Sequence, residues 1–220
     1  MSKLVIYGGS HAANLAKEIV KNKNFSLNFK IISITKPGAT LASFPFPNLD
    51  YLTSNDICVV QCFGNSLFKK NIKITYESGK KTIHLLSYCP LNQKEIEREY
   101  LSLEKSISLL QCKIYVIDNF IRHARCCKEH RDKRIPVYQI VQNKRLFKHF
   151  SKLPNVTVLD HKALLGIRMK KLKNNAFYGS LLKDSVHLKR QYYSAIIANF
   201  YKTHMLGIVG PVVNSAASIV

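Results

Sequence analysis

The sequence predicts an α/β protein in which five strands form a parallel sheet covered on both faces by helices. Apolar runs of strand length alternate along the chain with segments whose apolar residues recur at helical spacing. The apolar run at 57–62 is continuous rather than alternating, which is typical of a strand buried on both faces of a parallel sheet. The five expected strands lie at 4–7, 30–34, 57–62, 113–117 and 156–159.

Helical segments and one hairpin complete the expected elements. The first helix follows the first strand at 12–20, an amphipathic helix spans 96–110, and the last carries apolar residues from 188 to 196. Residues 71–87 predict a hairpin that turns at Ser78-Gly79. Its arms carry Ile74 and Tyr76 before the turn, and Ile83 and Leu85 after it.

Length and composition favour one domain. The chain has 220 residues, of which 46% are hydrophobic, and this suits a single well-packed core. We expect a domain at 1–206 and a flexible apolar tail at 207–220. No apolar run approaches the roughly 20 residues that span a bilayer, and the first residues do not resemble a signal peptide. The six cysteines are therefore expected to be reduced thiols in a cytoplasmic or other intracellular protein.

The charge is strongly positive, with 34 Lys and Arg against 13 Asp and Glu, a formal net charge of +21. Residues 121–175 hold 15 of these cations and three of the acids. This segment is either a solvated face or an electrostatic footprint for nucleic acid or another polyanion. The cations that would form the footprint are Arg122, Arg125, Lys128, Arg131, Lys133, Arg134, Lys170 and Lys171.

Candidate site residues follow the first three strands at the edge of the sheet where ligands bind in such folds. Ser10 follows Gly8-Gly9 and would stand at a helix N-terminus, either as a nucleophile or merely as a helix cap. Gly38 follows the second strand and could bring a backbone N–H close to a ligand, or form an ordinary turn. Asn65 follows the third and could donate its amide to an oxyanion, or be a turn residue.

Asp184 and His187 precede the last helix. An Asp three residues before a His can hold the imidazole by its Nδ1–H and leave Nε2 free to accept a serine proton. The alternative is a capping Asp beside a surface His.

The four segments together resemble the block pattern of the SGNH (GDSL) hydrolases. LVIYGGSHAANL resembles the first block, KPGATL the second, CFGNSLF the third and KDSVHL the last, so that the resemblance covers residues 4–188. The KPGATL and GGSH forms are similar in particular to the small esterase domains of some retrotransposon first-reading-frame proteins.

The resemblance implies a three-layer α/β/α fold with a flavodoxin-like doubly wound sheet, and no metal or organic cofactor. It implies that Ser10 attacks an ester carbonyl while His187, oriented by Asp184, acts as general base and then general acid. The backbone N–H groups of Ser10 and Gly38 and the side chain of Asn65 would form the oxyanion hole. Two positions depart from the family pattern, since Gly9 and Ser66 stand where acids are usual. These two departures put in doubt whether the loops around the catalytic residues are held as in the family.

Two rival sites remain open. His123, Cys126, Cys127 and His130 would share one face of a helix and could bind zinc, although two buried thiols on a helix face are the simpler interpretation. Asp160-His161 could supply another base, although a helix-capping pair is favoured.

The leading hypothesis is thus a serine esterase that hydrolyses acetyl or short acyl esters. One alternative is a weakly active or inactive module of the same fold that binds nucleic acid or another polyanion. Another is an assembly domain within a larger viral or element-encoded polyprotein.

Overall fold

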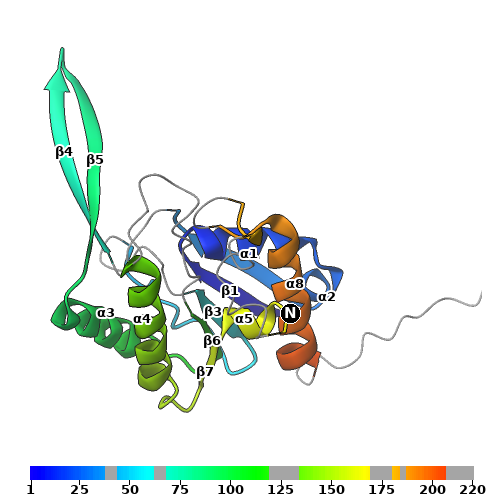
Figure 1. The fold of residues 1–220 in the computed structure, drawn as a ribbon. Coiled ribbons are helices and arrows are strands. Elements are labelled where there is room, and N and C mark those ends of the chain that lie inside the picture. The colour runs from blue at the N-terminus through cyan, green and yellow to red at the C-terminus, as the bar shows by residue number, and fades with distance from the viewer. Residues whose placement is uncertain (38–43, 62–67, 119–133, 169–179, 184–186, 207–220) are drawn as a thin grey trace, which may run out of the picture.

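A computed structural model describes residues 1–37, 44–61, 68–118, 134–168, 180–183 and 187–206 and contains a five-stranded parallel sheet (Figure 1). The strand order is β2-β1-β3-β6-β7, the doubly wound order in which the chain reverses direction beside β1. All five predicted strands are confirmed, with small changes at their ends. They are β1 (Ser2–Gly8), β2 (Phe29–Thr35), β3 (Ile57–Gln61), β6 (Lys113–Ile117) and β7 (Val156–Leu159).

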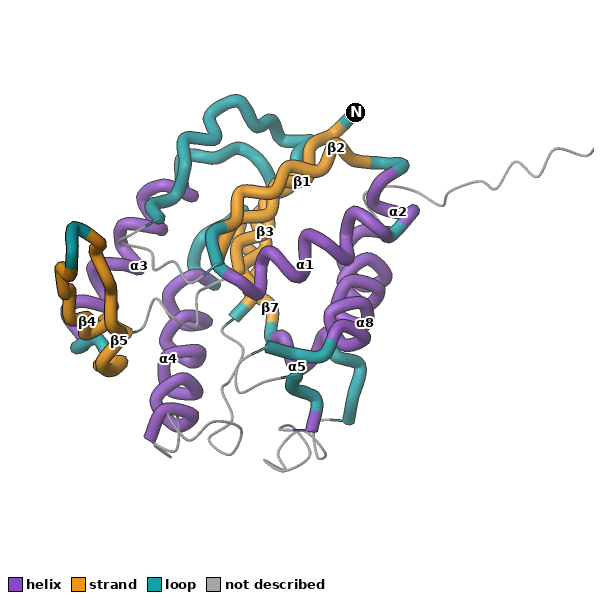
Figure 2. Tube along the Cα trace, turned by 90° about the horizontal axis from the view of Figure 1, so that it is seen from above, coloured by secondary structure: helices purple, strands orange, loops and turns teal. Residues whose placement is uncertain are grey.

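Helices cover both faces of the sheet, so the predicted three-layer α/β/α architecture is confirmed (Figure 2). The two faces follow directly from the alternation of β1. Leu4 and Ile6 pack with α1 (Ser10–Lys21) and α8 (Arg190–Phe200), whereas Val5 and Tyr7 pack on the opposite face with α3 (Gln93–Ile107) and α4 (Arg134–Phe150). Every residue from Leu4 to Tyr7 is fully buried, as a central parallel strand requires.

Local sequence explains several helix boundaries. Asn92 caps α3 by accepting from the backbone N–H of Glu95, whose carboxylate accepts from the backbone N–H of Asn92. The helix ends at Ile107, so the prediction of helix to residue 110 was three residues too long. Helix α4 was not predicted, although Leu146 and Phe150 lie four residues apart and are both buried. The described residues also include two four-residue helices, α2 (Lys23–Ser26) and α5 (His161–Leu164).

The predicted hairpin is confirmed as β4 (Phe68–Glu77) and β5 (Lys80–Pro90), which form a separate two-stranded sheet. Ser78 and Gly79 both have positive φ, at 50° and 76°, as a tight hairpin turn requires. The ribbon projects away from the main sheet (Figure 1). Ile74 and Tyr76 are exposed near its tip.

The last helix begins later than predicted, because Leu188 lies in an isolated antiparallel bridge with Leu182 rather than in α8. After Phe200 the chain continues as a π-helical turn, Tyr201–Met205. In the described residues, no helix combines the length and apolar character needed to cross a membrane. The predicted tail at 207–220 lies outside the described residues.

Two of the six cysteines lie in the described core. Cys58 and Cys112 are free thiols buried under the α3–α4 face, as predicted for reduced core cysteines. Burial raises the pKa of Cys112 to about 11 and that of Cys58 further still, so both stay protonated and unreactive near neutral pH.

Candidate active site

The turn that carries Ser10 depends on Gly8. Its φ is +151°, and a Cβ there would lie 2.8 Å from both the Cβ of Ala12 and the carbonyl oxygen of Gln61. Only glycine therefore allows the chain to leave β1 beside β3 and enter α1 directly. Gly9 is the N-cap of α1 and offers no side chain to its first turn, so Ser10, the first helical residue, is not the capping residue.

Ser10 and His187 meet despite the 177 positions between them in sequence. The distance from Ser10 Oγ to His187 Nε2 is 2.9 Å, within hydrogen-bond range, and both residues are partly buried. The structure thus brings together the two side chains that the sequence singled out as nucleophile and base.

Short-range backbone pairing holds His187 in place. The backbone N–H of Lys183 donates to the carbonyl of His187 at 2.7 Å, and that of Lys189 donates to the carbonyl of Leu181 at 2.8 Å. Together with the Leu182–Leu188 bridge, these bonds tie residues 181–183 to 187–189 immediately before α8. His187 is therefore presented by a constrained loop rather than by a helix.

A second histidine belongs to this site and was not predicted. The ring centroid of His11 lies 5.1 Å from that of His187, and His11 Nδ1 is 2.7 Å from the hydroxyl of Tyr193 on α8. His11 is buried, and it follows Ser10 directly on α1. The signal was in the first sequence block, GGSH, but nothing in the sequence placed Tyr193 opposite it.

A pocket of about 430 Å³ opens at the Ser10–His187 pair. Its walls come from α1, from Pro37 after β2, from Lys183, His187 and Leu188, and from the start of α8. The lining residues are Ser10, Ala13, Asn14, Lys17, Glu18, Lys21, Pro37, Lys183, His187, Leu188, Arg190 and Tyr193. A hydroxyl and an imidazole in contact at such a pocket have the geometry of an activated nucleophile.

Glu18 binds the two helices that carry the site together. Its Oε1 accepts from Arg190 Nε at 2.9 Å and from Lys21 Nζ at 3.1 Å, and its Oε2 accepts from Ser194 Oγ at 2.8 Å. Burial acts to raise the pKa of Glu18, but these hydrogen bonds outweigh it and hold the pKa below its ordinary value. The carboxylate therefore stays ionised and fixes α1 against α8.

Three predicted site residues, Gly38, Asn65 and Asp184, lie outside the described residues. The segments that lead to the first two start beside Ser10, because Gly8 pairs in register with Thr35 of β2 and with Gln61 of β3. In addition, the backbone N–H of Lys36 donates to the carbonyl of Gly8 at 3.0 Å. The segment before Asp184 is anchored by the Lys183–His187 bond.

His161, the rival candidate for the base, is buried and bonded to a carboxylate. Asp160 caps α5 by accepting from the backbone N–H of Lys162, as the capping interpretation predicted. His161 is fully buried, and its Nδ1 lies 2.6 Å from Asp118 Oδ1. Asn143 of α4 donates to Asp118 Oδ2, which ties β6, α4 and α5 together.

Donor atoms of Asp118, Asp160 and His161 all lie within 4.8 Å of one another, the spacing of a metal site. However, Asp118 Oδ1 already bonds both the backbone N–H and the ring of His161. The cluster is thus closed by its own hydrogen bonds. Burial raises the pKa of Asp118, although the neighbouring His161 acts to lower it.

Almost all of the zinc and polyanion candidates lie outside the described residues. The zinc candidates His123, Cys126, Cys127 and His130 lie outside the described residues, as do the footprint cations Arg122, Arg125, Lys128, Arg131, Lys133, Lys170 and Lys171. Arg134, the last member of the predicted footprint, is the first residue of α4. Polyanion binding through this face stays a prediction.

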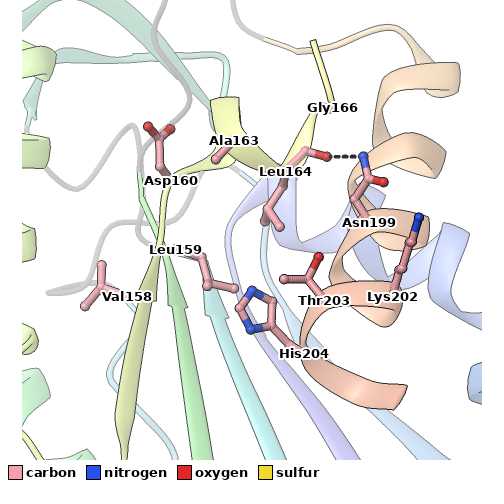
Figure 3. Close-up of a pocket in the computed structure, with 10 residues that line it drawn as sticks. All are labelled: Val158, Leu159, Asp160, Ala163, Leu164, Gly166, Asn199, Lys202, Thr203 and His204. Atoms are coloured by element: carbon pink, nitrogen blue, oxygen red, sulfur yellow. Dashed lines mark hydrogen bonds between the residues drawn. The ribbon is translucent and has the colours of Figure 1, made fainter. Parts of the chain in front are cut away.

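A larger hollow of about 610 Å³ lies elsewhere, between the end of β7, α5 and the π-helical turn (Figure 3). The hydrogen bond drawn there is structural, from Asn199 Nδ2 to the carbonyl of Leu164 at 2.9 Å. Gly166, with φ +67°, permits this contact because a Cβ would lie 2.7 Å from the Asn199 amide. Ser10 and His187 do not line this hollow, so the smaller pocket is the candidate active site.

No family model matches the sequence, and no curated protein matches it. The backbone, in contrast, resembles several solved structures. A member of the lipolytic G-D-S-L family from Veillonella parvula aligns with a TM-score of 0.60 at 10% identity, over 93% of this chain and 98% of that one. The acetyl xylan esterase AlAXEase aligns with 0.57 at 16% identity, over 92% and 100%. Axe2, an acetylxylan esterase from Geobacillus stearothermophilus, aligns with 0.55 at 13% identity, over 96% and 94%.

The chain has the fold of the SGNH (GDSL) hydrolases, as the four sequence blocks implied. Within that class, the similarity to retrotransposon esterase domains stays a prediction.

Proposed function

We propose that this protein is a serine esterase that hydrolyses acetyl or short acyl esters. The observation that carries the proposal is the 2.9 Å contact between Ser10 Oγ and His187 Nε2 at the mouth of a pocket. A serine hydroxyl is a weak nucleophile at neutral pH, and a neighbouring imidazole is the most common group that activates it.

The reaction proceeds in two balanced halves. Ser10 Oγ attacks the ester carbonyl while its proton passes to His187 Nε2, and the tetrahedral intermediate collapses as His187 protonates the departing alcohol. Water then attacks the acyl-serine, again giving a proton to His187 Nε2. Release of the carboxylic acid returns that proton to Ser10 Oγ.

The oxyanion is stabilised at the start of α1. Helix N-termini carry backbone N–H groups without intrahelical acceptors, and Ser10 is the first residue of this helix. In the proposal the N–H groups of Ser10 and Gly38 and the Asn65 amide donate to the oxyanion. The support is the register that starts all three segments at neighbouring strand ends, at Gly8, Thr35 and Gln61.

Asp184 orients the imidazole in this proposal. Nε2 of His187 faces Ser10, so Nδ1 is the atom that an orienting carboxylate would hold. Asp184 directly follows Lys183 in the sequence, and the backbone N–H of Lys183 bonds the carbonyl of His187. The names of two of the similar structures, both acetyl xylan esterases, favour an acetyl ester as the substrate.

The test compares the wild type, Ser10→Ala and His187→Ala on a chromogenic acetyl ester. Both variants are expected to lose activity by on the order of 10³-fold or more. Ser108→Ala is the matched control, because Ser108 is an exposed residue at the end of α3 and should leave the rate unchanged. A serine-reactive fluorophosphonate, followed by peptide mapping, should modify Ser10. Equal hydrolysis by wild type and Ser10→Ala would overturn the proposal.

A further inference from the structure

The candidate pocket extends well beyond the reacting atoms. Ser10, Asn14, Lys17 and Lys21 recur at helical spacing and line it from one face of α1. At 1.5 Å per residue, Lys17 lies roughly 10 Å along the helix axis from Ser10. An acetyl group bound at Ser10 is too short to reach Lys17 or Lys21, so this part of the wall could contact only a larger substrate.

That wall is more basic than the chain as a whole. Four of its twelve lining residues are Lys or Arg, compared with 34 of 220 in the sequence, and they come from separate segments. Lys17 and Lys21 lie on α1, Lys183 precedes His187, and Arg190 begins α8. The cations therefore converge on one space from several directions.

Glu18 is the single acid in the wall, and it bonds two of the four cations but not the other two. Glu18 accepts hydrogen bonds from Lys21 and Arg190 and neutralises part of their charge. Lys17 and Lys183 are exposed, and no carboxylate in the described part of the chain forms an ion pair with either. Two exposed ammonium groups, from α1 and from the residue at 183, are thus available to a ligand in the pocket.

We propose that the site is selective for esters that carry an anionic group, a carboxylate or a phosphate, on the part of the molecule that lies along α1. This inference rests on the proposed esterase function and specifies its substrate class. The ester is held at Ser10, and the anion contacts Lys17 and Lys183 several ångströms away. A pocket of about 430 Å³ accommodates a ligand of this kind, such as an acetylated acidic sugar.

The experiment measures acetate release from three matched substrates. These are methyl 2-O-acetyl-glucopyranoside, the corresponding glucuronide and the corresponding 6-phosphate, which differ at a position remote from the ester. The glucuronide and phosphate separate the two sources of negative charge. The wild type, a Lys17→Gln/Lys183→Gln double variant and a Lys148→Gln control are compared. Lys148 is exposed on α4 and does not line the pocket.

The wild type should hydrolyse at least one anionic substrate with a kcat/KM about tenfold above that of the neutral substrate. In the double variant this ratio should fall close to one, while the Lys148→Gln control should keep it. The wild-type ratio should also shrink at high salt, because the Debye length falls from about 10 Å at 0.1 M to about 3 Å at 1 M. A wild-type ratio near one, or a ratio kept by the double variant, would overturn the inference.

Binding provides a readout that does not need catalysis. The 2-acetamido analogues of the three sugars cannot be hydrolysed as esters, and their affinity for Ser10→Ala protein can be measured by calorimetry. The anionic analogues should bind about tenfold more tightly than the neutral one, with the difference removed by the two lysine substitutions. Charge-selective binding without any ester hydrolysis would contradict the esterase proposal alone. Hydrolysis without charge preference would contradict this inference alone.

Discussion

The imidazole rings of His11 and His187 lie 5.1 Å apart, and the hydroxyl of Tyr193 holds His11 by its Nδ1 at 2.7 Å. His11 therefore packs against the proposed base in an orientation that a residue of the last helix fixes. A well-defined supporting contact of this kind determines how closely a catalytic group keeps its productive geometry.

Tyr193→Phe removes that hydrogen bond while keeping the aromatic ring in the core. We expect kcat for an acetyl ester to fall about three- to tenfold with KM nearly unchanged, because His187 loses orientation rather than substrate contacts. Tyr192→Phe, which changes a neighbouring tyrosine that does not line the pocket, is the control. An unchanged kcat in Tyr193→Phe would contradict the positioning role.

Gly8→Ala should destabilise the fold by about 2–3 kcal/mol, because the new Cβ meets two atoms at 2.8 Å at a φ of +151°. Gly79→Ala is a matched control, since Gly79 also has positive φ but has nothing within 4 Å of its added Cβ. We expect that change to cost only about 1 kcal/mol. Urea denaturation measures both values, and equal losses would show that the close approach at Gly8 is unimportant.

The buried Asp118–His161 pair should be needed for stability rather than for catalysis. Asp118→Ala removes the hydrogen bond of a carboxylate to a fully buried imidazole and should lower the free energy of unfolding by about 3–5 kcal/mol. The double change Asp118→Ala/His161→Ala should cost less than the sum of the single changes, because they remove the same interaction. Denaturation of all four proteins gives the coupling energy. Strict additivity would mean that the pair does not interact.

The lowered pKa of Asp56 predicts that the protein loses stability in acid. Burial acts to raise its pKa, but bonds from the backbone N–H groups of Thr53 and Lys3, with the Thr53 hydroxyl, hold that pKa below 3.8. Between the lowered folded pKa and the ordinary value, the unfolded state binds the proton and the folded state does not. Stability from Asp56 is therefore fully present above the ordinary value and disappears as the pH falls through the folded pKa.

Asp56→Asn should accordingly cost about 2 kcal/mol at pH 7 and progressively less in acid. Denaturation of wild type and variant between pH 7 and pH 3 measures this difference. A constant difference over the whole range would contradict the assignment. Asp50→Asn is the control, because Asp50 is exposed and its backbone N–H, not its carboxylate, forms the described hydrogen bond.

The sequence predicted the strands well because each is a short apolar run bounded by polar or turn residues. Val5 and Tyr7 are apolar on one face of β1, and Leu4 and Ile6 on the other, so local pattern and final burial agree. Helix α4 was missed because its sequence lies in the strongly basic region, where charge dominated the interpretation. Leu188 was assigned to the last helix because its spacing fits, but pairing with Leu182 prevails over local periodicity.

The contact between Ser10 and His187 was predicted from the resemblance of four separate blocks to the SGNH pattern. No single block would have been enough to predict it. The side-chain contacts between α1 and α8 were not predictable from any local sequence pattern. Glu18 reaches Arg190 and Ser194, and His11 reaches Tyr193, in each case from the first helix to the last. Such contacts depend on how α1 and α8 pack together, which the periodicity of either helix alone does not specify.

The pairing of α1 with α8 also has a consequence for biosynthesis. A ribosome delivers the serine-bearing helix first and the imidazole-bearing loop 177 residues later, so the emerging chain carries the Ser10 hydroxyl without His187 while those residues are synthesised. Because His187 directly precedes α8, which packs on α1, we expect the two groups to meet when α8 docks. Reactivity of Ser10 toward a fluorophosphonate should therefore appear once α8 has docked on α1, and it would report that docking chemically.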